Sequence, residues 1–213
     1  MSLRVLYGGT FDPVHAGHLA VARAARDRLG AAVRLVPAAV PPHRGPTAAS
    51  ASDRADLLAL AIGDEPGLGV DMRELRRDGP SYTVDTLREV RSDIGPRAPL
   101  AWLVGADAFR GLARWDRWQA LFDLAHFVVA VRPGHDPDDL PEELASACRG
   151  RWTDEGAELS EEPAGRLFRL ELEPHPAASS ELRRRLAAGE DPGDWLPPAV
   201  AAEIARRGLY RAA

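Results

Sequence analysis

The chain has 213 residues, 45% of them hydrophobic, and a formal net charge of −5. This length suits one α/β domain, and the negative charge gives no global support to coating a nucleic acid. No apolar run reaches membrane-spanning length and no signal peptide is recognisable, so we expect no membrane association and a cytoplasmic location. The single cysteine, Cys148, cannot form an internal disulfide, and we expect it to be a packing residue.

All 27 basic residues are arginine, and lysine is absent. The chain therefore has no Walker A lysine and no lysine that could form a Schiff base. Any phosphate must be held by arginine, histidine, backbone N–H groups or a metal ion.

Strand-like and helix-like segments alternate, which predicts a Rossmann-like α/β fold: a doubly wound parallel sheet with helices on both faces. Strands are expected at Arg4–Tyr7, Ala32–Pro37, Gly69–Met72, Leu100–Val104, Phe127–Val131 and Leu167–Leu172. Helices are expected at His15–Leu29, Ser52–Ile62, Thr83–Ile94, Ala106–Gly111, Arg117–Phe122, Pro141–Arg149, Ser180–Ala188 and Pro198–Arg207. We expect residues 1–213 to form a single domain, with a small helical part from about residue 178 to the end.

Two segments outside these elements are predicted to lie at the surface. The run Pro133–Glu142 is rich in proline and aspartate, which is typical of a solvated loop, although His135 and its acidic neighbours also allow a metal site. The acidic run Asp154–Gly165 predicts an exposed turn or hairpin.

The first expected strand leads into a glycine turn and then into a helix that begins with two histidines. Gly8 and Gly9 lack a Cβ, so the backbone can approach a ligand closely or adopt a positive φ. His15 and His18 are three residues apart and share a helix face, with Gly17 between them. A helix start with two imidazoles favours a phosphate site. Plain helix caps or half a metal site are the alternatives, but metal sites need more ligands than this segment offers.

Ligands of open parallel sheets bind at the carboxyl ends of the strands, where the strand order reverses. Arg44 follows the second strand and can contact a phosphate through two N–H groups. Asp107 follows Gly105 at the end of the fourth strand, where its carboxylate can accept two ribose hydroxyls. A late helix begins with Ser179, Ser180 and Arg183, a set that suits phosphate but also an ordinary capped helix. We expect all these segments to meet the glycine turn at one edge of the sheet.

A second group of residues fits a carboxylate-bearing aromatic ligand. Thr83 is the expected N-cap of a helix, and the amides of Ser81, Tyr82 and Thr83 could bind a carboxylate there. Trp115 and Trp118 offer flat faces for a pyridine ring, or else belong to the core.

The run from Gly8 to Leu19 resembles the signature of bacterial nicotinate-nucleotide adenylyltransferases, within the nucleotidyltransferase superfamily that carries His-x-Gly-His. The run Pro80–Leu87, followed by Gly-Ala-Asp and a Trp-x-x-Trp pair, is similar to this family in particular, and the resemblance extends from Leu3 to Tyr210. Two departures stand out. Arg44 replaces the family's lysine, and Ala177-Ala178 replace its Ile-Ser.

The resemblance implies transfer of AMP from ATP to nicotinate mononucleotide, forming nicotinate adenine dinucleotide and pyrophosphate, with Mg²⁺ entering with ATP and no protein side chain as a metal ligand. It implies that His18 contacts the α-phosphate in the transition state and that Trp118, ahead of Trp115, stacks on the pyridine ring. The implied catalytic residues are His15, His18 and Arg183. The implied ATP-binding residues are Gly8, Gly9, Thr10, Phe11, His15, His18, Arg44, Gly105, Asp107, Ser179, Ser180 and Arg183. The implied nicotinate-nucleotide-binding residues are Gly9, Thr10, Arg44, Ser81, Tyr82, Thr83, Trp115 and Trp118.

Other interpretations stay open at this point. The acceptor could be nicotinamide mononucleotide or phosphopantetheine, although helix N-terminal amides favour a carboxylate over a neutral amide. A catalytically silent nucleotide sensor or an ATP-dependent ligase could use the same motif. The sequence is compatible with a monomer or a small homo-oligomer.

Overall fold

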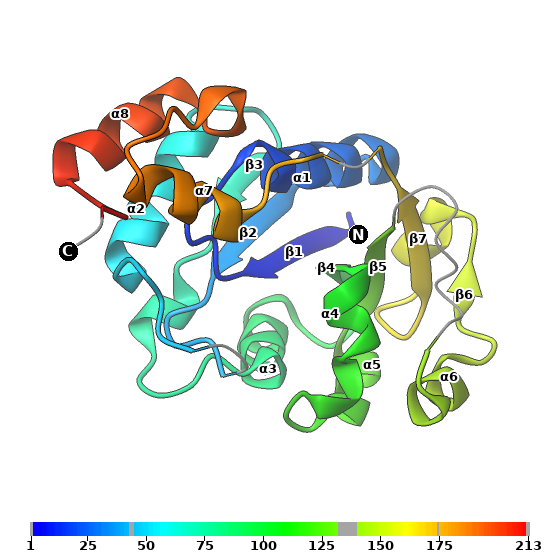
Figure 1. Cartoon of the computed structure of the whole chain (residues 1–213). Coiled ribbons are helices and arrows are strands. Elements are labelled where there is room, and N and C mark those ends of the chain that lie inside the picture. Colours follow the sequence, from blue (N-terminus) through cyan, green and yellow to red (C-terminus); the bar gives the residue numbers. More distant parts are fainter. Residues whose placement is uncertain (1, 43–44, 132–139, 174, 212–213) are drawn as a thin grey trace.

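The computed structural model describes residues 2–42, 45–131, 140–173 and 175–211. Its centre is a seven-stranded sheet in the order β3-β2-β1-β4-β5-β7-β6, in which neighbouring strands pair in parallel. Helices α1, α2, α7 and α8 lie on one side of this sheet and α3 to α6 on the other (Figure 1). The predicted doubly wound α/β fold is confirmed.

The strands are β1 (Arg4–Gly9), β2 (Val33–Pro37), β3 (Leu68–Val70), β4 (Leu100–Gly105), β5 (His126–Val131), β6 (Trp152–Thr153) and β7 (Leu167–Glu171). The helices are α1 (Ala16–Leu29), α2 (Ala51–Ile62), α3 (Thr83–Ile94), α4 (Ala106–Arg110), α5 (Leu121–Leu124), α6 (Glu142–Cys148), α7 (Ser179–Ala187) and α8 (Pro198–Arg207).

Strand alternation divides the apolar interior into two cores, one on each face of the sheet. In β1, Val5 joins the core under α1, α2 and α8, whereas Leu6 joins the core against α3, α4 and α5. In β4, Leu103 and Trp102 divide in the same way. Because successive side chains of a strand point to opposite faces, a run of consecutive apolar residues is what a strand covered on both sides requires.

The element predictions hold with small shifts at the ends, and the exceptions have local causes. Strand β6 was not predicted, because two residues are too few to show a pattern. The run Asp154–Gly165 is no simple exposed turn, since it contains a 3₁₀ helix whose Leu159 is completely buried. The run predicted as a helix from Arg117 is a 3₁₀ turn followed by the short α5.

Helix ends follow the expected chemistry at one place and depart from it at another. Gly30 ends α1 in the left-handed conformation, with φ 57°, which only glycine adopts without strain. The predicted N-cap Thr83 is wrong: Tyr82 is the cap, makes no side-chain capping bond, and Thr83 is the first helical residue. Cys148 is buried and forms no disulfide, as its predicted packing role requires.

The C-terminal segments lie against the first half of the sheet. The Arg207 guanidinium on α8 pairs with Asp53 and Asp56 on α2, at 2.8 and 2.9 Å. These ion pairs hold α8 against α2. Within the described residues no helix is long and apolar enough to cross a membrane.

Candidate active site

A cleft of about 1110 Å³ opens at the carboxyl ends of β1 and β4. The strand order reverses here, because the chain moves from β1 out to β3 and then returns to β4 on the other side of β1. This is the place where open parallel sheets bind ligands. The lining includes the following predicted residues: Gly8, Gly9, Thr10, Phe11, His15, His18, Ser81, Tyr82, Thr83, Gly105, Asp107, Trp115, Ser179 and Arg183.

Protein packing gives a reason for Gly8 and Gly9 that the sequence did not predict, and the positive φ allowed for them is not adopted. A Cβ on Gly8 would overlap the Trp102 ring, and one on Gly9 would lie only 2.8 Å from Phe11. The missing side chains therefore let two aromatic rings pack under the turn. Both glycines still line the cleft.

Arg54, from the buried face of α2, holds the turn after β1 in place. Its guanidinium donates to the carbonyl of Thr10 at 2.6 Å and to that of Ala38 at 2.7 Å, with longer bonds to Ala39 and Ala49. The side chain is completely buried, and burial lowers the pKa of Arg54. Because Thr10 follows β1 and Ala38 follows β2, this residue joins the two loops that form one wall of the cleft.

Both the carboxylate and the backbone carbonyl of Asp12 accept hydrogen bonds from the protein. Its carboxylate oxygens accept the N–H groups of Ala48 at 2.8 Å and Ala49 at 3.2 Å, and the residue is buried. Its backbone carbonyl accepts Arg183 Nη1 at 2.6 Å. Burial raises the pKa of Tyr210, near the C-terminus, and the negative charge of Asp12 raises it further. Asp12 is therefore a structural carboxylate of the turn.

His15 and His18 form a stacked pair at the start of α1. Their ring centroids are 3.7 Å apart, and the His15 backbone N–H donates to His18 Nδ1 at 3.3 Å. A neutral His18 therefore carries its proton on Nε2. His15 occupies the N-cap position, one residue before the predicted helix. Both imidazoles line the cleft.

His15 is neutral at neutral pH. Burial, and then repulsion from the nearby His175, lower the pKa of His15 to about 4. Its buried Nδ1 has no hydrogen-bond partner among the described residues. This nitrogen faces Gly17, since a Cβ on that residue would lie 3.1 Å from it, so its surroundings are set by the protein.

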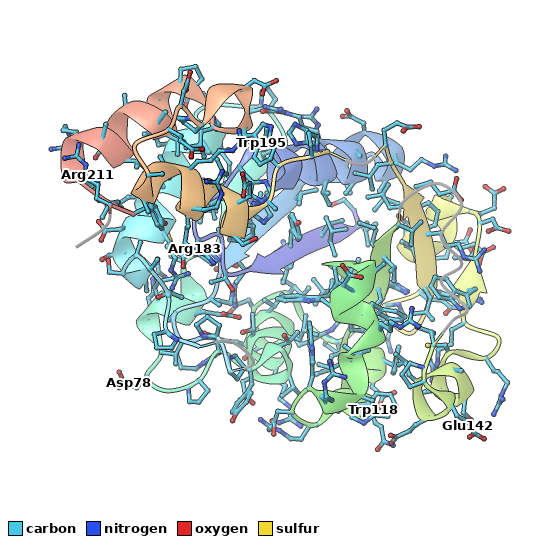
Figure 2. All side chains as sticks on the ribbon, viewed as in Figure 1. Asp78, Trp118, Glu142, Arg183, Trp195 and Arg211 are labelled. Carbon is cyan, nitrogen blue, oxygen red and sulfur yellow. The ribbon has the colours of Figure 1, made fainter. Side chains whose placement is uncertain are left out.

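Helix α7 brings its first residues against the same turn. Ser179 Oγ donates to the carbonyl of Pro13 at 3.0 Å, so this hydroxyl ties α7 to the turn. Arg183, one turn further along, donates to the carbonyl of Asp12 and also lines the cleft (Figure 2). Ser180 is exposed and does not contribute to the lining. Of the predicted serine pair, only Ser179 reaches the cleft.

Ser81 holds two loops together at the opposite end of the cleft. Its Oγ accepts the N–H groups of Ala39 and Val40, and its own N–H donates to the carbonyl of Val40. The buried Glu74 beside it accepts the Thr86 hydroxyl at 2.6 Å; burial raises the pKa of Glu74, against the lowering effect of hydrogen bonds from Thr86 and Ser81. The Ser81 hydroxyl is thus engaged within the protein.

The backbone amides at this helix start are only partly available. The N–H of Tyr82 donates to the carbonyl of Pro80 at 3.0 Å, and that of Ser81 is engaged as described above. The Thr83 N–H, in the first turn of α3, has no acceptor among the described residues. Of the three predicted amides, the structure leaves that of Thr83 for a ligand.

The two tryptophans have different environments. Trp115 is half-buried and lines the cleft. Trp118 is only 8% exposed, packs edge-on against Phe122 in the core and does not line the cleft. In Figure 2 it lies at the lower edge of the molecule, far from Arg183. Arg117, in the left-handed conformation with φ 47°, separates the two rings and turns the chain between them. The structure therefore contradicts the preference for Trp118.

The remaining predicted residues divide into two groups. Gly105 ends β4, and the exposed Asp107 begins α4; both line the cleft. Arg44 lies outside the described residues, as do His43 and His135, although the neighbouring Gly45 and Pro42 line the cleft. Nowhere in the described part of the chain do three His, Cys, Asp or Glu side chains group as metal ligands.

Three residues of this site were missed in the sequence. Arg54 precedes Leu57 and Leu58 by three and four positions, so its place on the apolar face of α2 was readable from spacing. Glu74 sits in a 3₁₀ turn that has no periodicity to read. His175 lines the cleft from the segment before α7, where no motif surrounds it.

The class of protein emerges from comparison with known families. The family model described as cytidylyltransferase-like matches residues 6–185, which span the sheet, the cleft and most of α7. Solved structures with the same fold include a Plasmodium falciparum nicotinic acid mononucleotide adenylyltransferase complexed with NaAD, with a TM-score of 0.72 and 16% identity, covering 99% of this chain and 98% of that one. The same enzyme complexed with APC gives a TM-score of 0.69 over the same shares of the two chains.

Curated relatives narrow the class. A Stenotrophomonas maltophilia protein named a probable nicotinate-nucleotide adenylyltransferase is 56% identical, over 99% of this chain and 98% of its own length. A protein of the same name from Laribacter hongkongensis is 50% identical, over 97% and 93%. The chain belongs to the family of nicotinate-nucleotide adenylyltransferases.

Proposed function

We propose that the protein transfers AMP from ATP to nicotinate mononucleotide, as the names of its relatives indicate. The observation that carries the proposal is the cleft itself, which joins a phosphate turn with two histidines to a second region bearing a half-buried tryptophan and a helix N-terminus. One region suits a triphosphate and the other an aromatic ring with a carboxylate.

The chemistry requires no general base from the protein. An oxygen of the acceptor's phosphate, already anionic, attacks the α-phosphorus of ATP and forms the new P–O bond. The bond between that phosphorus and the bridging oxygen breaks, and pyrophosphate leaves with the electron pair. The protein then contributes position and neutralisation of developing charge. His18 donates from Nε2 to the α-phosphate in the transition state.

The ATP contacts follow the walls of the cleft. His15 and Thr10, which both line the cleft, hold the triphosphate. Arg183 and Arg44 steady the outgoing pyrophosphate, and Asp107 accepts ribose hydroxyls at the end of β4. Mg²⁺ would enter with ATP and would neutralise charge on the phosphates. Asp12 is not proposed as its ligand, because both carboxylate oxygens already accept backbone N–H groups.

The acceptor contacts lie at the other end. The Thr83 N–H and the positive end of α3 bind the nicotinate carboxylate, and Trp115 stacks on the pyridine ring. We further propose one domain over the whole chain, with α7 and α8 as its C-terminal part, acting in the cytoplasm as a monomer or small homo-oligomer.

Incubation of the purified protein with ATP, Mg²⁺ and nicotinate mononucleotide tests the reaction. Pyrophosphate and nicotinate adenine dinucleotide should form in equal amounts, measured by a coupled phosphate assay and by chromatography. Absence of both products, with the protein folded by circular dichroism, contradicts the proposal.

The two tryptophans should separate in one experiment. Trp115→Ala should raise the KM for nicotinate mononucleotide by about tenfold, as expected for loss of one stacking contact. Trp118→Ala should leave that KM unchanged while lowering the free energy of unfolding by about 3–5 kcal/mol, because it empties a core position. Steady-state kinetics and urea denaturation of both variants make the comparison. A raised KM in Trp118→Ala together with an unchanged KM in Trp115→Ala would show that Trp118 stacks on the pyridine ring.

A further inference from the structure

A third imidazole stands beside the two of the His-x-Gly-His motif. His175 lies in the segment between β7 and α7, is half-buried, and lines the same cleft. It is near enough to His15 for its charge to contribute to the lowered pKa of that residue.

Gly17 leaves room between the His15 ring and the Cβ of His175. A Cβ placed on it would lie 3.1 Å from the His15 ring and 3.4 Å from the Cβ of His175. Any side chain at this position would push against His15 on one side and meet His175 on the other. The glycine of the motif therefore opens a place where His175 can sit against the start of α1.

The orientation of the His175 ring is fixed by its own segment. Its Nδ1 accepts the N–H of Ala177 at 3.1 Å, so the imidazole carries its proton on Nε2. The same segment continues into Ser179 and Arg183, whose bonds to the carbonyls of Pro13 and Asp12 attach it to the phosphate turn. These bonds attach to the phosphate turn the one segment that carries both His175 and Arg183.

We propose that His175 is a third phosphate-binding histidine, which donates from Nε2 to the phosphates that leave as pyrophosphate. Three observations support it: His175 lines the cleft next to His15, its Nδ1 accepts a backbone N–H so that Nε2 is the donor, and its segment is bonded to the phosphate turn. In a chain without lysine, an added imidazole supplies a further N–H donor for phosphate. The inference rests on the function proposed above.

Substitution at His175 tests the contact, because a half-buried side chain can be removed without emptying the core. His175→Ala should raise the KM for ATP and the dissociation constant for pyrophosphate by about tenfold, the ratio typical of one hydrogen bond to a charged group. The KM for nicotinate mononucleotide and the thermal midpoint should stay unchanged. His175→Gln, which keeps an N–H donor, should recover much of the affinity.

Pro176→Ala is the matched control, because it loosens the same segment without removing an imidazole and Pro176 does not line the cleft. It should bind ATP and pyrophosphate as the wild type does. Pyrophosphate binding is measured by calorimetry, independently of turnover, so a failure of the proposed reaction does not hide the result. Unchanged pyrophosphate and ATP constants in His175→Ala, or equal losses in Pro176→Ala, would overturn the proposal.

Discussion

His18→Ala should lower kcat by about 100- to 1000-fold, while the KM for ATP changes only a few-fold. Loss of one preorganised donor to developing charge has an effect of about this size. Three contacts fix the orientation of the His18 ring. Its centroid lies 3.7 Å from that of His15 in a stacked pair and 5.0 Å from that of Phe11 in a T-shaped pair, and its Nδ1 accepts the His15 N–H. An interaction made mainly in the transition state appears in kcat more than in binding.

Val21→Ala provides the control for His18, because Val21 lies on the same helix and lines the same cleft without a polar atom. Single-turnover and steady-state rates of both variants are compared with the wild type. If His18→Ala kept a kcat within threefold of Val21→Ala, the transition-state role of His18 would be wrong.

Arg54→Met should lower the free energy of unfolding by about 3–5 kcal/mol, the range seen when one partner of a buried charged network is removed. The change leaves the carbonyls of Thr10 and Ala38 without their donor and removes a buried cation that interacts with the charge of Asp12. For a chain of this length, the expected fall in Tm is about 10 °C. Urea denaturation and calorimetry measure the two quantities.

Arg206→Met is the matched control, because the Arg206 side chain is 68% exposed and pairs with Glu203 at the surface. Its Tm should stay close to that of the wild type. Arg54→Lys keeps the charge but reaches fewer carbonyls, so its stability should lie between those of wild type and Arg54→Met. An Arg54→Met protein as stable as Arg206→Met would show that the buried guanidinium does not hold the two loops.

The sequence predicted the fold and the position of the cleft well, because both depend on local patterns. Alternating strands and helices imply a parallel sheet, and the carboxyl ends of parallel strands share one edge. Residues as distant as Thr10, Asp107 and Arg183 could therefore be assigned to one site in advance, and all three line the cleft.

The failures come from features that only three-dimensional packing decides. Two tryptophans three residues apart look equivalent in a sequence, but the positive φ of Arg117 turns Trp118 into the core and leaves Trp115 at the cleft. The need for glycine at position 8 comes from Trp102, which is 94 residues further along the chain. The bonds that engage the Ser81 hydroxyl likewise come from a different loop.

The proposed reaction is adenylylation of the acid form of a pyridine mononucleotide in this cleft. Its direct test is the ratio of kcat/KM for nicotinate mononucleotide to that for nicotinamide mononucleotide, each measured with saturating ATP and Mg²⁺ by pyrophosphate release. The helix N-terminus at Thr83 favours a carboxylate over a neutral amide, so we expect a ratio well above one. A ratio of one or below, or no pyrophosphate with nicotinate mononucleotide, would contradict it.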